Sequence, residues 1–388
     1  MSNTPNLRDT ASVNATDPAA PAPNVPGPEP ASVPADTFAL RTPWGERDYG
    51  DAIRGSGARK LASSSVAPLV AAARGYQTIQ SREDLLAFRR RRLTPKRGND
   101  VIRQQILALA QDGEEALGMP WFRADTVTGT GTEVVGMTTA QYRPSVPEMR
   151  REVRADGSEK QRAIKYLNEH GDQSVIDLHP AIPASWIAAS EATASRVLII
   201  EGLLKADAAL THLLLESGAT AEQLSATGPV ETTRQQLRDL LELVPPAHRT
   251  LVFALVGVGN WHNKAEWNSI DLTNRTVYVG FDGDIAENPM VWTQAQKLGE
   301  WVERKHAEPR FLRLDDPDFA MRVLNDPAVA ERIGRNSDGS PKRMGLDDFL
   351  ANVGSWKQAL ATATGELPLK PQGTQERRPQ AGDFRVTG

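Results

Sequence analysis

Acidic residues stand at the ends of two short apolar runs, and this placement leaves the chain few possible folds. Glu201 follows the run 197–200, and Asp282 and Asp284 follow the run 277–281 as Asp-Gly-Asp. Short runs rich in β-branched residues and bounded by glycine are typical of buried parallel strands. Ligands of an open α/β sheet bind beyond the carboxyl ends of its strands. The sequence therefore predicts an α/β domain that gathers these carboxylates at one edge of a parallel sheet.

A cation is predicted at that edge, because carboxylates gathered in one place repel one another unless something neutralises them. A further pair, Asp347 and Asp348, opens the segment 345–350, and Asp348 is expected to be the N-cap of a helix over 349–353. An isolated Asp-Gly-Asp is usually a turn, so the metal hypothesis depends on the strand before it. All-oxygen sites suit Mg²⁺ or Mn²⁺. The predicted metal ligands are Glu201, Asp282, Asp284 and Asp347.

Composition excludes several classes of protein. The 388 residues carry a net charge of −4, so any nucleic-acid-binding surface is local. The chain has no cysteine, which excludes disulfides, a thiol nucleophile and every cysteine-bearing zinc site. No apolar stretch approaches the ~18 residues of a membrane span, and the N-terminus lacks the layout of a secretory signal. We therefore expect a cytoplasmic protein that does not bind a membrane.

Changes in composition predict the organisation of the chain. The segment before about 40 is rich in Ala, Pro and Ser, and such segments do not bury enough apolar area to become ordered. Helical periodicity comes next, then alternation typical of strands, then strands separated by helices, which indicates a βαβ-type domain. The predicted parts are a disordered tail at 1–45, a small helical basic region at 46–120, a β-rich subdomain at 121–190, the α/β domain at 191–356 and a disordered tail at 367–388.

Individual elements follow from the same periodicities. Strands are expected at 197–200, 251–258, 276–281 and 310–314, and helices at 203–216, 232–243 and 292–306. Trp261 and Trp267 could stack on bases, although burial against the sheet is the stronger expectation. His262 is expected on the polar surface, and Asp207 is expected either behind the acidic site or facing solvent.

A basic run could contact phosphates. A helix predicted from 85 leads into four consecutive arginines, followed by two more basic residues at 96 and 97. Arg90 and Arg91 are the candidates for nucleic-acid binding in this run. The alternative is a solvated surface turn of like charges, and the sequence does not separate the two.

Several motifs together resemble the TOPRIM domain of primases, topoisomerases and some nucleases. Ile-Ile-Glu-Gly at 199–202 followed by Phe-Asp-Gly-Asp at 281–284 is similar to the strand-end Glu and the Asp-x-Asp pair that hold divalent metal in that family. Lys-Tyr-Leu-Asn at 165–168 resembles a motif that precedes the TOPRIM domain of bacterial replicative primases, and 133–143 resembles the strand upstream of it. The segment 345–350 resembles their later acidic segment. The implied architecture is a TOPRIM-like domain preceded by a smaller, primase-core-like β-rich subdomain.

A closer resemblance covers residues 60–355 and is to a family of uncharacterised bacterial TOPRIM-like proteins carried by plasmids, phages and integrative elements. The shared motifs are Glu-Gly-x-x-Lys-Ala-Asp-Ala at 201–208 and Gly-Val-x-Asn-Trp at 257–261. This chain departs from replicative primases by having Lys205 where they usually have an acid. It also has neither a cysteine zinc site nor a Walker lysine motif. Template engagement and unwinding would then require a separate helicase or replication protein.

The resemblance implies a role for each candidate residue. Glu201 would bind metal or accept a proton from the attacking hydroxyl, beside Asp282 and Asp284. Lys205 would neutralise phosphate charge, or would pair with Glu201 one helical turn away. The remaining nucleotide or nucleic-acid contacts would come from Lys165, Arg143, Gly257 and Gly259.

Three functions remain open. The first is a magnesium-dependent, primase-like nucleotidyltransferase that acts on nucleotides and single-stranded DNA in the replication of a mobile element. The second is a TOPRIM nuclease, which would use the same acids to activate water. The third is an inactive module that binds nucleic acid or nucleotide for a replication or defence partner. The Lys-Tyr-Leu-Asn segment favours the first over the second, and Lys205 favours the third.

Overall fold

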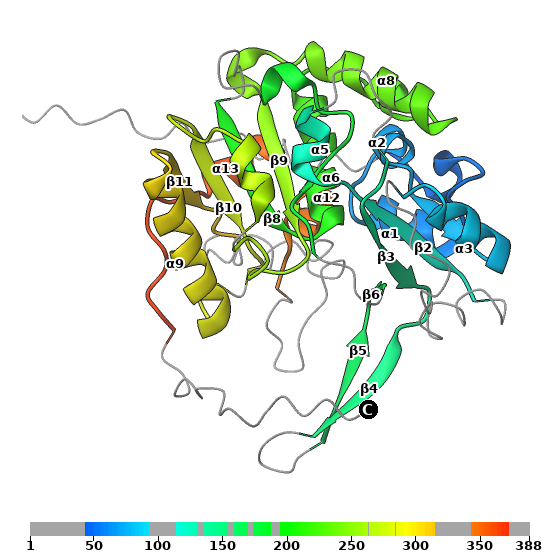
Figure 1. The fold of residues 1–388 in the computed structure, drawn as a ribbon, viewed down its shortest axis with the longest axis horizontal. Helices are drawn as coiled ribbons and strands as arrows, with labels where there is room; N and C mark the ends of the chain where they lie inside the picture. The colour runs from blue at the N-terminus through cyan, green and yellow to red at the C-terminus, as the bar shows by residue number, and fades with distance from the viewer. Residues whose placement is uncertain are drawn as a thin grey trace, which may run out of the picture. The chain divides into compact units, whose positions relative to one another are not determined.

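The larger sheet has the strand order β11-β10-β8-β9-β7 (Figure 1). Its strands are β7 (Asp177–Leu178), β8 (Arg196–Glu201), β9 (Thr250–Leu255), β10 (Thr276–Gly280) and β11 (Glu308–Phe311). The computed structural model describes residues 43–92, 114–129, 136–153, 159–169, 174–187, 195–262, 264–283, 285–314 and 343–371, all within the unit Phe38–Gly388. The strands β8 to β11 pair in parallel, and only β7 is antiparallel to its neighbour. The predicted α/β class, with its parallel strands, is confirmed.

Helices cover this sheet on both faces. The chain passes through α6 (Leu203–Glu216) on the way from β8 to β9, and through α9 (Pro289–Arg304) on the way from β10 to β11. The two connections run toward opposite edges of the sheet, and right-handed crossovers in opposite directions place their helices on opposite faces. Two short helices, α12 (Leu346–Asn352) and α13 (Trp356–Ala361), pack on α6. In α9, a Cβ at Gly299 would lie 2.7 Å from the Phe311 ring, so glycine allows the close approach to β11.

A smaller antiparallel sheet comes from the first half of the chain. Its order is β1 (Gln77–Ile79), β2 (Ala116–Trp121), β3 (Thr139–Pro144) and β6 (Leu167–Asn168). The region predicted as helical, 46–120, therefore contributes strands as well as α1 (Gly55–Ser63), α2 (Pro68–Arg74) and α3 (Arg82–Arg89). The predicted boundary at 120 lies inside β2. Strands this short carry little periodicity, and long-range pairing rather than local pattern defines them.

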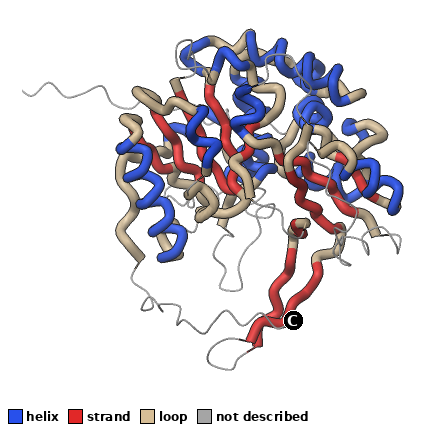
Figure 2. Tube along the Cα trace, in the orientation of Figure 1, coloured by secondary structure: helices blue, strands red, loops and turns tan. Residues whose placement is uncertain are grey.

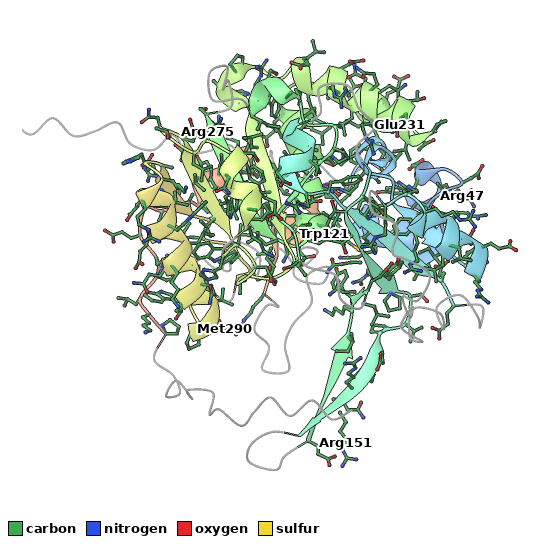
Figure 3. The ribbon with its side chains drawn as sticks, viewed as in Figure 1. Arg47, Trp121, Arg151, Glu231, Arg275 and Met290 are labelled. Atoms are coloured by element: carbon green, nitrogen blue, oxygen red, sulfur yellow. The ribbon has the colours of Figure 1, made fainter. Side chains whose placement is uncertain are left out.

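A separate two-stranded ribbon joins β3 to β6. It consists of β4 (Glu148–Val153) and β5 (Glu159–Ile164), paired antiparallel (Figure 2). Arg151, labelled in Figure 3, lies on β4 and forms an ion pair with Glu159 of β5. The alternating segment predicted at 132–143 is described only from residue 136 onward, and β3 lies within it.

Most predicted elements of the second half are present with small changes in their ends. The helix at 203–216 has the predicted bounds, and α8 (Val230–Glu242) and α9 begin two and three residues earlier than expected. Proline supplies the reason at both starts, since Pro229 is the N-cap of α8 and Pro289 the first residue of α9. The predicted N-terminal tail extends too far, because Trp44 is buried and its Nε1 donates to Ser225 Oγ at 2.8 Å.

A fully buried ionic cluster ties α2 to the larger sheet. The guanidinium of Arg74 binds Asp177 Oδ2 of β7 at 2.9 Å and Asp207 Oδ1 of α6 at 2.8 Å. Tyr76 Oη also donates to Asp207, at 2.7 Å. Burial raises the pKa of Asp177 to about 6, against the lowering effect of Arg74, and the charge of Asp207 adds to the rise. Burial also raises the pKa of Asp207, although Arg74 opposes it. Asp207 therefore does not face solvent, which was one of the two expectations for it.

No helix in the described part of the chain is both long and apolar enough to cross a membrane.

Candidate active site at the carboxyl edge of the parallel sheet

The carboxyl ends of β8 and β10 bring two predicted site residues to the same edge. Gly280 is the register partner of Ile200, so Glu201, the last residue of β8, and Asp282, just beyond β10, lie at nearly the same level. The loop after β10 is held at two points. The Phe281 side chain is buried, and the N–H of Gly283 donates to Met344 O at 3.2 Å. Asp284 lies outside the described residues. The predicted convergence of strand ends is therefore observed for Glu201 and Asp282.

Lys205 lies at the centre of this edge. It belongs to the first turn of α6, and its Nζ donates to Asp282 Oδ1. Burial alone lowers the pKa of Lys205, but the charges of Asp282, Asp347 and Glu201 outweigh that effect, so the pKa is raised. The ion-pair partner of Lys205 is thus Asp282, whereas sequence spacing suggested Glu201. The reason is that the loop after β10 reaches over the start of α6.

Asp347 of α12 also lies near this lysine. A Cβ built on Gly345 would lie 2.5 Å from Lys205 Cε and 2.8 Å from Asp347 Oδ1, which places the two side chains around this glycine. The Asp347 side chain is buried, accepts a hydrogen bond from Ser64 Oγ at 2.8 Å and lies 3.7 Å from Lys60 Nζ. Three carboxylates therefore act on one ammonium group.

Asp348 does not have the predicted N-cap role. The helix α12 begins at Leu346, three residues earlier than expected, so Gly345 is the N-cap and Asp348 is the third helical residue. Its Oδ2 accepts a 3.4 Å hydrogen bond from Gly345 N. Burial and then the neighbouring charge of Asp347 raise the pKa of Asp348. With α12 beginning at Leu346, the Asp347 side chain lies beside Gly345, close to Lys205.

The loop after β9 forms another wall of the site. Gly202 N donates to Leu255 O at 2.8 Å, which fixes the end of β8 against β9. A Cβ on Gly257 would lie 4.0 Å from Glu201 Oε1 and 3.2 Å from Asn260 Nδ2, so this glycine borders the site, as predicted. Gly259 instead faces Gln294 of α9, where a Cβ would lie 3.9 Å from Gln294 Cδ. Only the first of the two predicted glycines lies beside the carboxylates.

Arg143 of β3 and Tyr166, which directly precedes β6, complete the site. The Arg143 guanidinium lies 5.4 Å from the centre of the Tyr166 ring, a cation–π arrangement. Desolvation raises the pKa of Tyr166; the positive charge of Arg143 opposes this shift and the carboxylate of Asp347 adds to it. The Tyr166 side chain and the Arg143 guanidinium therefore lie within electrostatic range of the carboxylate of Asp347. Lys165 is exposed beside them.

The predicted basic run has a largely structural role. Arg89 and Arg92 both bind the carboxylate of Glu169, at 3.0 and 2.9 Å. Arg91 donates to Gly75 O at 2.9 Å and lies 5.4 Å from the Phe88 ring. Arg90 is exposed. In the described part of the run, three arginines bind partners within the fold and Arg90 is exposed, while the basic positions 96 and 97 lie outside the described residues.

Sequence analysis missed Lys60, Ser64 and Tyr166. Lys60 and Ser64 reach Asp347 from more than 280 residues away, and no local pattern marks them. Tyr166 stands inside the Lys-Tyr-Leu-Asn motif and could have been chosen on that ground. Trp261 and Trp267 are buried, as expected, and His262 is exposed with Gln294 Oε1 2.9 Å from its Nε2.

Comparisons with protein-family models, with curated proteins and with solved structures find no significant match to this chain. Among the described residues, no three His, Asp or Glu side chains stand together in a geometry suited to a metal ion.

Proposed function

We propose that this protein is a magnesium-dependent nucleotidyltransferase with a TOPRIM-like domain, which extends nucleic-acid chains in the replication of a plasmid, phage or integrative element. The observation that carries the proposal is the position of Lys205, whose ammonium is bound by Asp282 and attracted by Asp347 and Glu201. An acidic site of this kind at the carboxyl edge of a parallel sheet suits cations and the phosphates they accompany.

The side chains present fit a divalent cation in their chemistry. Carboxylate oxygens are the donors that Mg²⁺ and Mn²⁺ prefer, and the Lys205 ammonium already stands among them as a protein-borne cation. The residues that would hold the metal are Glu201, Asp282, Asp284 and Asp347. When bound, the metal would neutralise triphosphate charge and polarise the phosphorus under attack.

The chain's own residues supply the other parts of the proposed reaction. Glu201 borders the loop of Gly257, where the absence of a side chain leaves room beside its carboxylate for an attacking hydroxyl, whose proton it would accept. Displaced from Asp282, Lys205 would bind a phosphate oxygen by a charge-assisted hydrogen bond. At the rim, Arg143 would contact phosphate and Tyr166 would stack on a base.

A second candidate is a module that binds nucleotide or nucleic acid without reacting. The Lys205–Asp282 ion pair favours it, because a lysine that stays in place would occupy the position of a metal. In either case unwinding would be the task of a separate helicase or replication protein, with the protein acting in the cytoplasm.

The test is an incubation of the purified protein with Mn²⁺ or Mg²⁺, labelled nucleotides and single-stranded DNA. The proposal expects template-dependent oligomers from the wild type and none from Asp282→Asn. A variant of exposed Lys357 on α13, Lys357→Ala, serves as the active control. If the DNA is shortened instead, the protein is a nuclease and the proposal is wrong. If the protein binds metal but forms neither product, it is the non-reacting module.

A further inference from the structure

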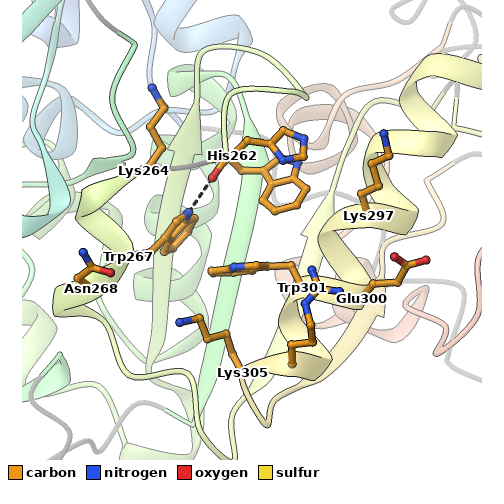
Figure 4. A pocket seen from close by; sticks show the side chains of 10 residues that line it. His262, Lys264, Trp267, Asn268, Lys297, Glu300, Trp301 and Lys305 are labelled. Carbon is orange, nitrogen blue, oxygen red and sulfur yellow. Dashed lines mark hydrogen bonds between the residues drawn. The ribbon is translucent and has the colours of Figure 1, made fainter.

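A cavity of about 350 Å³ opens on the face of the larger sheet that α9 covers, away from the acidic edge (Figure 4). It lies between α9 and the segment that follows β9. Tryptophans and long basic side chains form most of its wall, and Figure 4 shows Trp267 and Trp301 facing it from the two sides. Nothing in the proposed reaction uses this cavity.

The aromatic part of the wall is rigid. Trp301 packs 5.1 Å from Trp267 and 5.8 Å from Trp261, measured between ring centres. Trp267 Nε1 donates to Trp261 O at 2.9 Å, and Phe253 of β9 supports Trp267 from below at 5.4 Å. Trp301 is half-buried while the other two tryptophans are buried, so its ring is the one that a ligand could cover. Flat, fixed rings are suited to stacking on bases.

The rim of the cavity is positive. Lys264, Lys297, Arg304 and Lys305 line it, against one acid, Glu300. Lys297, Arg304 and Lys305 are exposed, and Lys305 Nζ lies 5.8 Å from the Trp301 ring. Lys264 differs, because its Nζ already donates to Ser174. A ligand with a flat ring and a negative group would therefore satisfy both parts of the wall.

A second cavity of about 490 Å³ continues the first. The two share Trp267, Asn268, Arg304 and Lys305 and together form a groove along the carboxyl-terminal end of α9. The groove is thus longer than one nucleotide requires. An extended occupant such as a polynucleotide strand could follow both cavities, with the shared Trp267, Arg304 and Lys305 between them, whereas a single small molecule would fill only one.

We propose that this α9 groove binds single-stranded nucleic acid, with a base on Trp301 and backbone phosphates on Lys297 and Arg304. The choice of occupant rests on the proposed function, for which the groove would hold template. The loop 256–262 connects the two places, since Gly257 borders Glu201 and His262 lines the groove.

The inference is tested by measuring the binding of a fluorescein-labelled oligothymidylate of about 12 nucleotides by fluorescence anisotropy. The buffer contains EDTA, so the metal site is not involved. We expect Lys297→Glu with Arg304→Glu to weaken binding roughly tenfold or more and to reduce the salt slope by about 1.4, since each lost phosphate contact on a single strand accounts for about 0.7. The matched control is Arg47→Glu with Arg82→Glu, the same change of charge at exposed positions outside the groove (Arg47 in Figure 3). It should change affinity by less than about twofold.

The aromatic half of the proposal has its own variants. Trp301→Leu should weaken binding roughly tenfold, and Trp301→Phe, which keeps a ring, should lie close to wild type. If the groove and control charge variants weaken binding equally, the attraction is unspecific and the proposal is overturned. Binding of thymidine monophosphate as tight as that of the oligomer would overturn the strand as occupant. Asp282→Asn should bind oligomer normally, so loss of chain extension with intact binding would count against the acidic site and not against the groove.

Discussion

Lys205 is bound by Asp282, a residue 77 positions later in the chain, across the carboxyl edge of the parallel sheet. The pair exists because the loop after β10 and the start of α6, which follows β8, meet at the same edge. Without a ligand, the ammonium neutralises part of an acidic site that would otherwise be self-repelling. The same contact makes Lys205 a competitor of any other cation.

Replacing Lys205 with glutamine should therefore strengthen divalent-metal binding while abolishing chain extension. The amide keeps most of the length of the side chain but removes the charge that competes for Asp282. We expect the rise in melting temperature on adding Mn²⁺ to be larger in Lys205→Gln than in the wild type. Thermal denaturation with and without Mn²⁺ measures this, with Lys357→Ala as control. Equal shifts in both proteins would show that Lys205 and the metal do not share a site.

Asp282→Ala should eliminate stabilisation by Mg²⁺ and Mn²⁺ without unfolding the protein. The Asp282 side chain is 44% exposed, so its loss creates no cavity, and it also relieves repulsion among the acids. Asp284→Ala is expected to behave in the same way. Melting curves over a range of metal concentration provide the measurement. A wild type indifferent to both metals would remove the support for the metal site.

Arg74→Met should destabilise the protein by about 3–5 kcal/mol, because it leaves two carboxylates buried without a counter-charge. Asp207→Asn should cost only about 1 kcal/mol, since Arg74 keeps Asp177 and the amide keeps a hydrogen-bonding oxygen. Urea unfolding of both variants gives the two free energies. The prediction is tested by which variant loses more stability. If Asp207→Asn lost more than Arg74→Met, the cluster would not carry excess negative charge.

His212 should make the protein less stable in acid. It is buried on α6 beside Ser65, and burial lowers its pKa to about 4. The unfolded chain binds a proton near pH 6.5, before the folded chain does, so the stability contributed by neutral His212 is present above that pH and is lost as pH falls toward 4.

The corresponding measurement compares wild type with His212→Gln by urea unfolding at pH 7 and pH 5. Between pH 7 and pH 5, the wild type should lose about 2 kcal/mol of unfolding free energy relative to His212→Gln. Using a difference cancels the other titrating groups, among them Asp177, whose raised pKa acts in the opposite direction. A difference independent of pH would mean that His212 has the same pKa in the folded and the unfolded chain.

The helices and strands that were predicted correctly are those marked by an apolar pattern in consecutive residues. The apolar periodicity of 203–216 gave the bounds of α6, and the apolar runs before Glu201 and Asp282 gave β8 and β10. Such patterns can be recognised locally, because the apolar face of a helix and a buried strand are each formed by residues close together in the sequence. The meeting of the two acids followed from the same signals, through the rule for carboxyl ends of parallel strands.

Pairings over long separations were beyond the reach of the sequence. Glu169 lies 80 residues from Arg89, so the basic run gave no sign that a carboxylate would take up two of its arginines. One of the two alternatives for Lys205 was an ion pair with Glu201, four residues away, whereas its partner Asp282 lies 77 residues away. In each case charge made an interaction probable, and only the folded topology decided which partner came within reach.

The position of α12 has a consequence for the order of events during synthesis. Among the described residues, the strands of the larger sheet all precede residue 312, whereas Asp347 lies in α12, which follows them. A nascent chain that has just completed its sheet therefore holds Glu201, Lys205 and Asp282 but lacks the final carboxylate and its link to Ser64. The acidic centre can therefore form only after the ribosome has synthesised α12, later than the sheet on which the centre lies.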